Sequence, residues 1–440
     1  MFLRKIVLAL MAFLVFSVPI AGGRLSIDVS LGPIGLMSLV GILAFLFAIA
    51  HLLFGQRGLG QAKVPMDRSV TLFGVFVALN FASVGWAQNS GVAISSSMDY
   101  LQILVFVWLL LFLRPEPNSL TVILHAFFLG SVFMVANALY DVLSLGFDAI
   151  GGSRTAGFGT GLNSAAFKAA VGIPFAFYLW QRGSPRLRWV YLLYVPAAVF
   201  LVLLTGSRGG AAAAIVALLG GLWLLLRVEH GGAVRFSHKR LFASAAVAIV
   251  LAFSVLPAAY DRFQSQADRI ASLANPMDHE ASSSTSGFGG RVEIWQRLVK
   301  AYADNPVLGV GSGGSRAVWL DYSGDDGLPV SVYWIVKSAH NAYFLIASET
   351  GTIGLLLYFA VLVSLFVRIQ SFPRQERVLF VTLMMMALVN GVVSSATTGR
   401  EFNFALFASV IVLVRQELAA RERRRAGAAD RSEGLRPNPI

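Results

Sequence analysis

The 440-residue chain contains no cysteine and few charged residues: 13% of its side chains are Asp, Glu, Lys or Arg, whereas 56% are hydrophobic. Charged residues make up about a quarter of an average soluble domain. The absence of cysteine excludes disulfides and thiol chemistry. The shortage of charge excludes an ordinary soluble domain and predicts a polytopic membrane protein.

Long apolar runs recur along the whole chain, and a transmembrane helix needs about 20 mainly apolar residues. The first run follows Arg4 and Lys5 and has the size of a signal-sequence core, but no small-x-small cleavage pattern follows it, so we expect a retained helix. No repeat of 20–50 residues is visible. We predict an all-α fold with about twelve transmembrane helices, at 5–22, 32–54, 69–87, 98–114, 119–145, 164–181, 187–205, 209–227, 241–258, 342–367, 376–396 and 401–417.

Lysine and arginine gather in alternate short loops, which defines the cytoplasmic side and places both termini there. The net charge of +12 therefore reflects membrane orientation and anionic lipid partners, and we expect no nucleic-acid partner. The expected organisation is an N-terminal set of nine transmembrane helices, a large external loop, three further transmembrane helices and a disordered basic tail, at 1–258, 259–341, 342–417 and 418–440.

The large loop contains two segments with helical periodicity, at 259–273 and 291–303. The second should stop at Asp304-Asn305-Pro306, because proline disfavours helical geometry in the residue before it. Gly309 to Gly314 then matches the G-x-G-x-x-G spacing of dinucleotide-binding turns. No strand–turn–helix context surrounds this pattern, so we interpret it as a tight turn where backbones approach closely.

Arg208 lies in a short connection, Thr205 to Gly210, on the external side of the membrane. Positive charge on that side opposes the orientation signal, which favours a functional arginine over a chance charge. Ser207 is expected to cap the following helix. The small residues of 209–212 should let neighbouring backbones come close. Arg154 belongs to the same external layer.

Arg291 opens the second loop helix, and alone it is equally well interpreted as a solvated arginine. His340 lies where the chain re-enters the membrane, before the helix expected from residue 342. The helix dipole there disfavours a protonated ring. We therefore expect a neutral imidazole that can accept a proton, although a histidine hydrogen-bonded at an interface is the plainer alternative.

Two ionisable residues fall inside expected transmembrane helices, where burying charge is expensive. Lys168 is interpreted either as an interfacial anchor, because a long side chain can reach the surface, or as a functional cation. Glu349 lies about two turns from His340 and could border the same cavity.

The arginines expected at one membrane face, together with one histidine, indicate what kind of ligand the site binds. Several guanidinium groups fit a multiply charged oxyanion, since their planar forks bind phosphate in a bidentate manner. A lipid-linked phosphate or pyrophosphate explains both the arginines and the membrane. His340 could then deprotonate or orient an attacking hydroxyl. The candidate arginines are Arg154, Arg208, Arg291 and Arg400.

These residues resemble the motifs of the O-antigen ligase and polymerase superfamily. The resemblance covers about residues 150 to 400 and depends on the order of several short pieces around one large external loop. The pieces are 154–163, Thr205-Gly206-Ser207-Arg208-Gly209, Arg291-Val292-Glu293-Ile294-Trp295, Asn305-Pro306-Val307-Leu308-Gly309-Val310-Gly311, His340-Asn341-Ala342-Tyr343 and Glu349-Thr350-Gly351-Thr352-Ile353-Gly354.

The resemblance implies a GT-C-like glycosyltransferase in the Gram-negative inner membrane with a periplasmic active site. In the ligase branch, a glycan passes from undecaprenyl pyrophosphate to the lipid A–core oligosaccharide with inversion, without a metal ion or another cofactor. By motif match, Arg208 and Arg291 would bind the pyrophosphate and His340 would act on the acceptor hydroxyl. Arg154, Asn341 and Arg400 are further expected substrate-binding residues.

Three alternatives remain open. O-antigen polymerases and protein O-oligosaccharyltransferases share the superfamily architecture, and the compact motif set favours a ligase over both. A twelve-helix secondary transporter belongs to a different class. Transporters of that kind usually show repeats and bind substrate near the bilayer midplane, whereas the polar residues here gather at one face.

Overall fold

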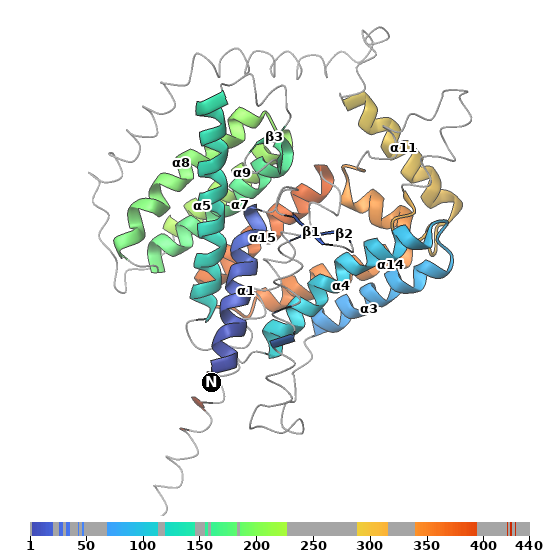
Figure 1. The fold of residues 1–440 in the computed structure, drawn as a ribbon, viewed down its shortest axis with the longest axis horizontal. Helices are drawn as coiled ribbons and strands as arrows, with labels where there is room; N and C mark the ends of the chain where they lie inside the picture. The colour runs from blue at the N-terminus through green and yellow to red at the C-terminus, as the bar shows by residue number, and fades with distance from the viewer. Residues whose placement is uncertain are drawn as a thin grey trace, which may run out of the picture.

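We describe the protein from a computed structural model that defines residues 2–20, 26–29, 32–35, 68–112, 119–145, 155–156, 160–182, 185–226, 288–315 and 339–393, together with a few isolated positions. Helices dominate the architecture (Figure 1). The long helices are α1 (Phe2–Ile20), α3 (Arg68–Ala82), α4 (Ser90–Phe112), α5 (Ser119–Leu145), α7 (Leu162–Arg182), α8 (Arg188–Thr205), α9 (Arg208–Leu226), α11 (Phe288–Asp304), α14 (Ala342–Ile369) and α15 (Arg374–Val393).

Seven helical segments in the described part of the chain are long and apolar enough to cross a membrane, and α1 and α9 contain shorter apolar stretches. These nine match nine of the expected transmembrane helices, and α5 has the expected bounds of 119–145. The expected helices at 241–258 and 401–417, and most of the one at 32–54, lie outside the described residues. The total of twelve therefore stays a prediction.

The structure corrects the expected boundaries at two helices. α4 begins at Ser90, eight residues before the expected start at 98, because the Asn89 side chain accepts a hydrogen bond from the Val92 backbone N–H (3.1 Å) and caps the helix. Its first turns are rich in serine and glycine, so hydropathy alone missed them. α11 begins at Phe288, three residues before the expected start at 291, so Gly289 and Gly290 lie in its first turn.

The all-α expectation is confirmed for the described part of the chain, in which two short antiparallel hairpins accompany the helices. The strands Ser26–Val29 (β1) and Gly32–Gly35 (β2) pair with Ser26 opposite Gly35. The second strand occupies positions expected to start a transmembrane helix. Thr155–Ala156 (β3) and Thr160–Gly161 (β4) form the other hairpin, just before α7.

Helix α7 lies at the centre of one half of the bundle, where it packs against α5, α8, α9 and α15. Small residues allow the close approach. Gly172 of α7 leaves room for the Tyr194 side chain of α8, whose hydroxyl donates to the Ala169 carbonyl (2.8 Å). Gly221 of α9 is covered by the ring of Phe177. Association in a bilayer depends on such packing rather than on the hydrophobic effect.

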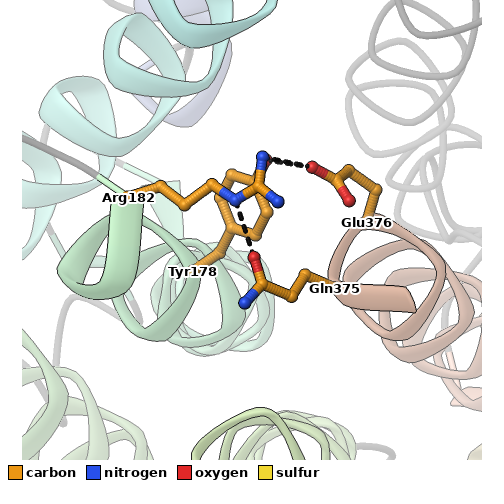
Figure 2. Close-up of polar contacts among 4 residues, drawn as sticks. All are labelled: Tyr178, Arg182, Gln375 and Glu376. Atoms are coloured by element: carbon orange, nitrogen blue, oxygen red, sulfur yellow. Dashed lines mark hydrogen bonds and ion pairs between the residues drawn. The ribbon is translucent and has the colours of Figure 1, made fainter. Parts of the chain in front are cut away.

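One end of this half is tied together by a polar cluster between α7 and α15 (Figure 2). Arg182 forms an ion pair with Glu376 (3.0 Å) and donates to the Gln375 side chain (2.6 Å). The Tyr178 hydroxyl donates to the same Glu376 oxygen (2.9 Å). The Glu376 carboxylate is buried, so its charge depends on these donors. We call this the Arg182 end and the opposite end, defined below, the His340 end.

The other half consists of α3, α4, α11 and α14 (Figure 1). Helix α14 is broken at Gly351, whose φ of 65° and ψ of −164° are not helical. The break frees backbone groups on both sides, and the segment after α11 satisfies them. Val310 and Gly311 donate their N–H groups to the carbonyls of Ser348 and Glu349 (2.9 Å each).

The exchange also runs in the opposite direction. The N–H of Thr352 donates to the Pro306 carbonyl (2.8 Å), and the N–H of Ile353 donates to the Val307 carbonyl (3.4 Å). Residues 305–315, which we call the glycine loop, therefore supply two N–H donors and two carbonyl acceptors. These satisfy the two carbonyls and two N–H groups that the break in α14 leaves unpaired. Three glycines of this loop, Gly309, Gly311 and Gly313, have positive φ. The interpretation of this pattern as a tight turn with close backbone approach is confirmed.

Replacing Gly351 by alanine should destabilise the protein by at least about 2 kcal/mol, since a β-carbon would strike the Val307 carbonyl and this backbone conformation suits glycine only. The measurement is the midpoint of thermal unfolding in detergent. Gly74→Ala in α3 is the matched control, because the nearest atom to its added β-carbon is 4.0 Å away. Equal midpoints for the two variants would contradict the packing described here.

Candidate functional site at the His340 end

The His340 end of the bundle is defined by the starts of α7, α9 and α14 and by the end of α15. Gly206 ends α8 in the left-handed conformation, with φ of 60°. The Ser207 hydroxyl then accepts a hydrogen bond from the Gly210 N–H (3.1 Å) and caps α9, as expected. Gly210 packs directly on Ala166 of α7, which confirms the close approach expected of the small residues. Arg208 is therefore the first residue of a fixed helix.

The register between α9 and α15 places Arg208 at the depth of the α15 terminus. The two helices are antiparallel, and Gly220 of α9 contacts the Thr382 side chain of α15. Arg208 precedes Gly220 by twelve residues and Val392 follows Thr382 by ten, which correspond to about 18 and 15 Å of helix. Val392 in turn accepts a hydrogen bond from Asn341. Position 208 thus lies within about a turn of the level of the His340–Asn341 segment.

Helix α11 is fixed against the same segment. The Trp295 indole donates to the Ala339 carbonyl (3.1 Å), and its ring meets Phe344 edge to face with centroids 5.7 Å apart. Ile294 and Leu298 are buried in the same contact. Position 291 is one turn before Trp295 on the same helix face. Arg291 is therefore one helical turn from the residue that bonds Ala339, the neighbour of His340 in the chain.

His340 occupies an unusual backbone conformation. Its φ of 50° makes it the one non-glycine residue with positive φ among the residues that the structure places. Such a conformation costs about 1–3 kcal/mol and persists where surrounding contacts hold it, often at functional sites. Here Trp295 holds the carbonyl before His340, and the capped start of α14 holds the residue after it.

Asn341 has a clear structural role at this point. Its side-chain oxygen accepts from the N–H groups of Tyr343 (2.9 Å) and Phe344 (3.0 Å), which caps α14. Its amide nitrogen donates to the Val392 carbonyl (3.2 Å), which joins α14 to the end of α15. The side chain is buried. A contact between Asn341 and substrate stays a prediction beside this capping role.

Sequence reasoning missed the contribution of Glu349 to this architecture. Its carboxylate accepts from the Ser315 hydroxyl (2.6 Å) at the end of the glycine loop, and its carbonyl accepts from Gly311. Glu349 is buried and holds the loop against α14. The feature visible in the sequence is a glutamate inside an apolar run with a glycine two residues later, Glu349 and Gly351.

Lys168 is buried within α7, with 6% of its surface exposed. A lipid-facing anchor should be exposed along its stem, so this burial disfavours the anchor interpretation. Arg154 and Arg400 lie outside the described residues, and the side chains of Arg208 and Arg291 are not described. Their expected contact with a common substrate therefore stays a prediction.

Asn341→Ala should lower the stability of the protein by about 1–2 kcal/mol, because the start of α14 loses its cap. Asn341→Ser should lose less, since a serine hydroxyl can accept the same N–H groups. Thermal unfolding of the two purified variants measures the difference. If the serine variant kept its stability but lost activity, a substrate contact would be needed to explain Asn341. Equal losses of stability in both variants would contradict the capping role.

Comparison with known proteins now adds an independent observation. Residues 193–359 match the family model described as O-antigen ligase. The match runs from within α8 to the second half of α14, and so includes Arg208, Trp295, the glycine loop and His340. No curated protein matches the chain. The match shows that residues 193–359 of the chain are similar to the O-antigen ligase family.

Proposed function

We propose that the chain is a GT-C-like O-antigen ligase that transfers a glycan from undecaprenyl pyrophosphate to a sugar hydroxyl of the lipid A–core oligosaccharide. The proposal places it in the Gram-negative inner membrane with both termini in the cytoplasm and the His340 end facing the periplasm. The observation that supports it is the strained His340, which lies between the Trp295 contact and the capped start of α14, within the residues of the family match.

In the proposed reaction, the acceptor hydroxyl oxygen attacks the anomeric carbon of the donor sugar as the bond to pyrophosphate breaks. The hydroxyl proton passes to the His340 imidazole, and the electron pair leaves with undecaprenyl pyrophosphate. Arg208 and Arg291 stabilise the negative charge that develops on the leaving group, with Arg154 and Arg400 as further binding residues. This chemistry needs no cofactor.

The fixed backbone around His340 supports this role. A general base must be held within hydrogen-bond reach of the proton that it accepts, and small misplacements are costly to rate. Trp295 and Asn341 constrain the peptides on either side of His340. The start of α14 also points its helix dipole at this residue, which favours the neutral ring.

Cells that make only the Arg208→Ala or His340→Ala variant should lack O-antigen on their lipopolysaccharide while the protein still inserts. A lipopolysaccharide gel with an immunoblot of membranes measures both. Arg186→Ala is the matched control, since this exposed arginine lies just before α8, at the Arg182 end. Normal O-antigen in either site variant would overturn the mechanism.

The same gel applied to a deletion strain separates the alternatives. Loss of a ligase leaves bare core while polymerised glycan accumulates on its carrier, whereas loss of a polymerase leaves core that bears single repeat units. An unchanged gel would favour a protein O-oligosaccharyltransferase or a transporter.

Trp295→Phe should reduce the turnover rate several-fold with little change in KM. Phenylalanine keeps the ring contact with Phe344 but loses the indole N–H that holds the Ala339 carbonyl. Steady-state kinetics of glycan transfer in detergent would give kcat and KM separately for each variant. Tyr302→Phe, which removes the hydroxyl bonded to Thr352 far from His340, is the control; an equal loss of turnover in both variants would indicate a general loosening of α11 instead.

A further inference from the structure

The turn that leaves α11 exposes two large apolar side chains. Val307 is 58% exposed and Leu308 is 43% exposed. They belong to the glycine loop, whose backbone is fixed by its exchange of hydrogen bonds with α14. These side chains are therefore held outward by a rigid segment.

The exposed pair continues the lipid-facing surface of α14. The Val307 carbonyl accepts from the Ile353 N–H, so the turn lies directly beside the start of the second half of α14. On that half, Ile353, Leu356 and Val363 are exposed at 41%, 63% and 61%, at a spacing that puts them on one helix face. Helix α14 is long and apolar enough to cross a membrane. The apolar surface of the turn and that of the helix are thus contiguous.

The length of α14 gives the depth of the turn. Gly351 and Arg368 are separated by seventeen residues of helix, or about 26 Å. The hydrocarbon core of a bilayer is about 30 Å thick. With Arg368 at the interface of the Arg182 end, Gly351 and the adjoining turn lie at the hydrocarbon boundary of the His340 end.

A second helix gives the same depth independently. Gly311 of the glycine loop packs on Ala87, next to Trp86, which is 38% exposed. Trp86 follows α3 and the 3-10 turn Ser83–Gly85 (η2), eighteen residues beyond Arg68, or about 27 Å if helical throughout. Exposed tryptophans gather at membrane interfaces. Both helices therefore place the glycine loop in the interfacial layer.

We propose that the turn Pro306–Leu308 inserts into the lipid bilayer at the His340 end, with Val307 and Leu308 among the acyl chains just below the headgroups. The partner is the bilayer itself. Insertion fixes the end of α11 at the membrane surface, and Trp295 then fixes its beginning over the His340 segment. The proposal holds whatever group the protein transfers.

The absence of cysteine makes a direct test possible. Val307→Cys and Leu308→Cys variants of the full chain are spin-labelled and reconstituted into phosphatidylethanolamine–phosphatidylglycerol vesicles. Power saturation then compares collisions with oxygen, which concentrates in the bilayer, and with a water-soluble nickel chelate. Collisions with oxygen should exceed those with nickel several-fold at both positions.

Two control positions define the scale. Leu356→Cys, on the lipid-facing side of α14, should resemble the two turn positions, whereas Gln296→Cys, exposed on α11, should favour nickel. A preference for nickel at 307 and 308 would place the turn in water and overturn the proposal. Protection of both positions from both reagents would show that protein covers the turn, for example a second copy of the chain, and would overturn it equally.

Discussion

The architecture depends on a reciprocal exchange of backbone hydrogen bonds at the break in α14. Two carbonyls and two amides that a continuous helix would satisfy internally are satisfied by the glycine loop. Near a bilayer, leaving such groups unpaired costs several kcal/mol each. The break and the loop are therefore required together, since neither is stable at that depth without the other. Gly351 and the three loop glycines provide the backbone conformations that make the exchange possible.

This exchange connects α14, the helix that follows His340, to α11, the helix that contains Arg291. Tyr302 near the end of α11 shares a hydrogen bond with Thr352 (2.8 Å), and Thr352 also donates to the Pro306 carbonyl (2.7 Å). Trp295 makes the second attachment, one turn from Arg291. Two contacts separated along one helix fix its position, so α11 is oriented relative to α14 without a large hydrophobic core of its own.

Much of the helical framework followed from hydropathy, because a transmembrane helix has a defined length and needs nearly continuous apolar sequence. The expected α5 and α14 begin at the observed residues for that reason. The early start of α4 was missed because a side-chain cap, and not apolar sequence, determines it. The short hairpins were missed because their strands are too short to show alternation.

The candidate site was predictable to a different degree. The placement of Arg208 and the capping by Ser207 followed from a short polar connection between two apolar runs. The bond between Glu349 and Ser315 did not, since it joins residues 34 positions apart through a helix break that hydropathy cannot reveal. The strained φ of His340 is likewise a product of tertiary contacts from Trp295 and Asn341, and no local sequence rule predicts it.

The docked glycine loop also determines which part of the chain could be exchanged as one piece between related proteins. Because its donors and acceptors match those of one particular helix break, the loop and the first half of α14 form a single cooperative element. A chimera that joined the glycine loop to a helix without a break like that at Gly351 would leave the backbone groups of both segments unpaired. Recombination that preserves folding must therefore place its junction beyond Ile353, within the uniform part of α14.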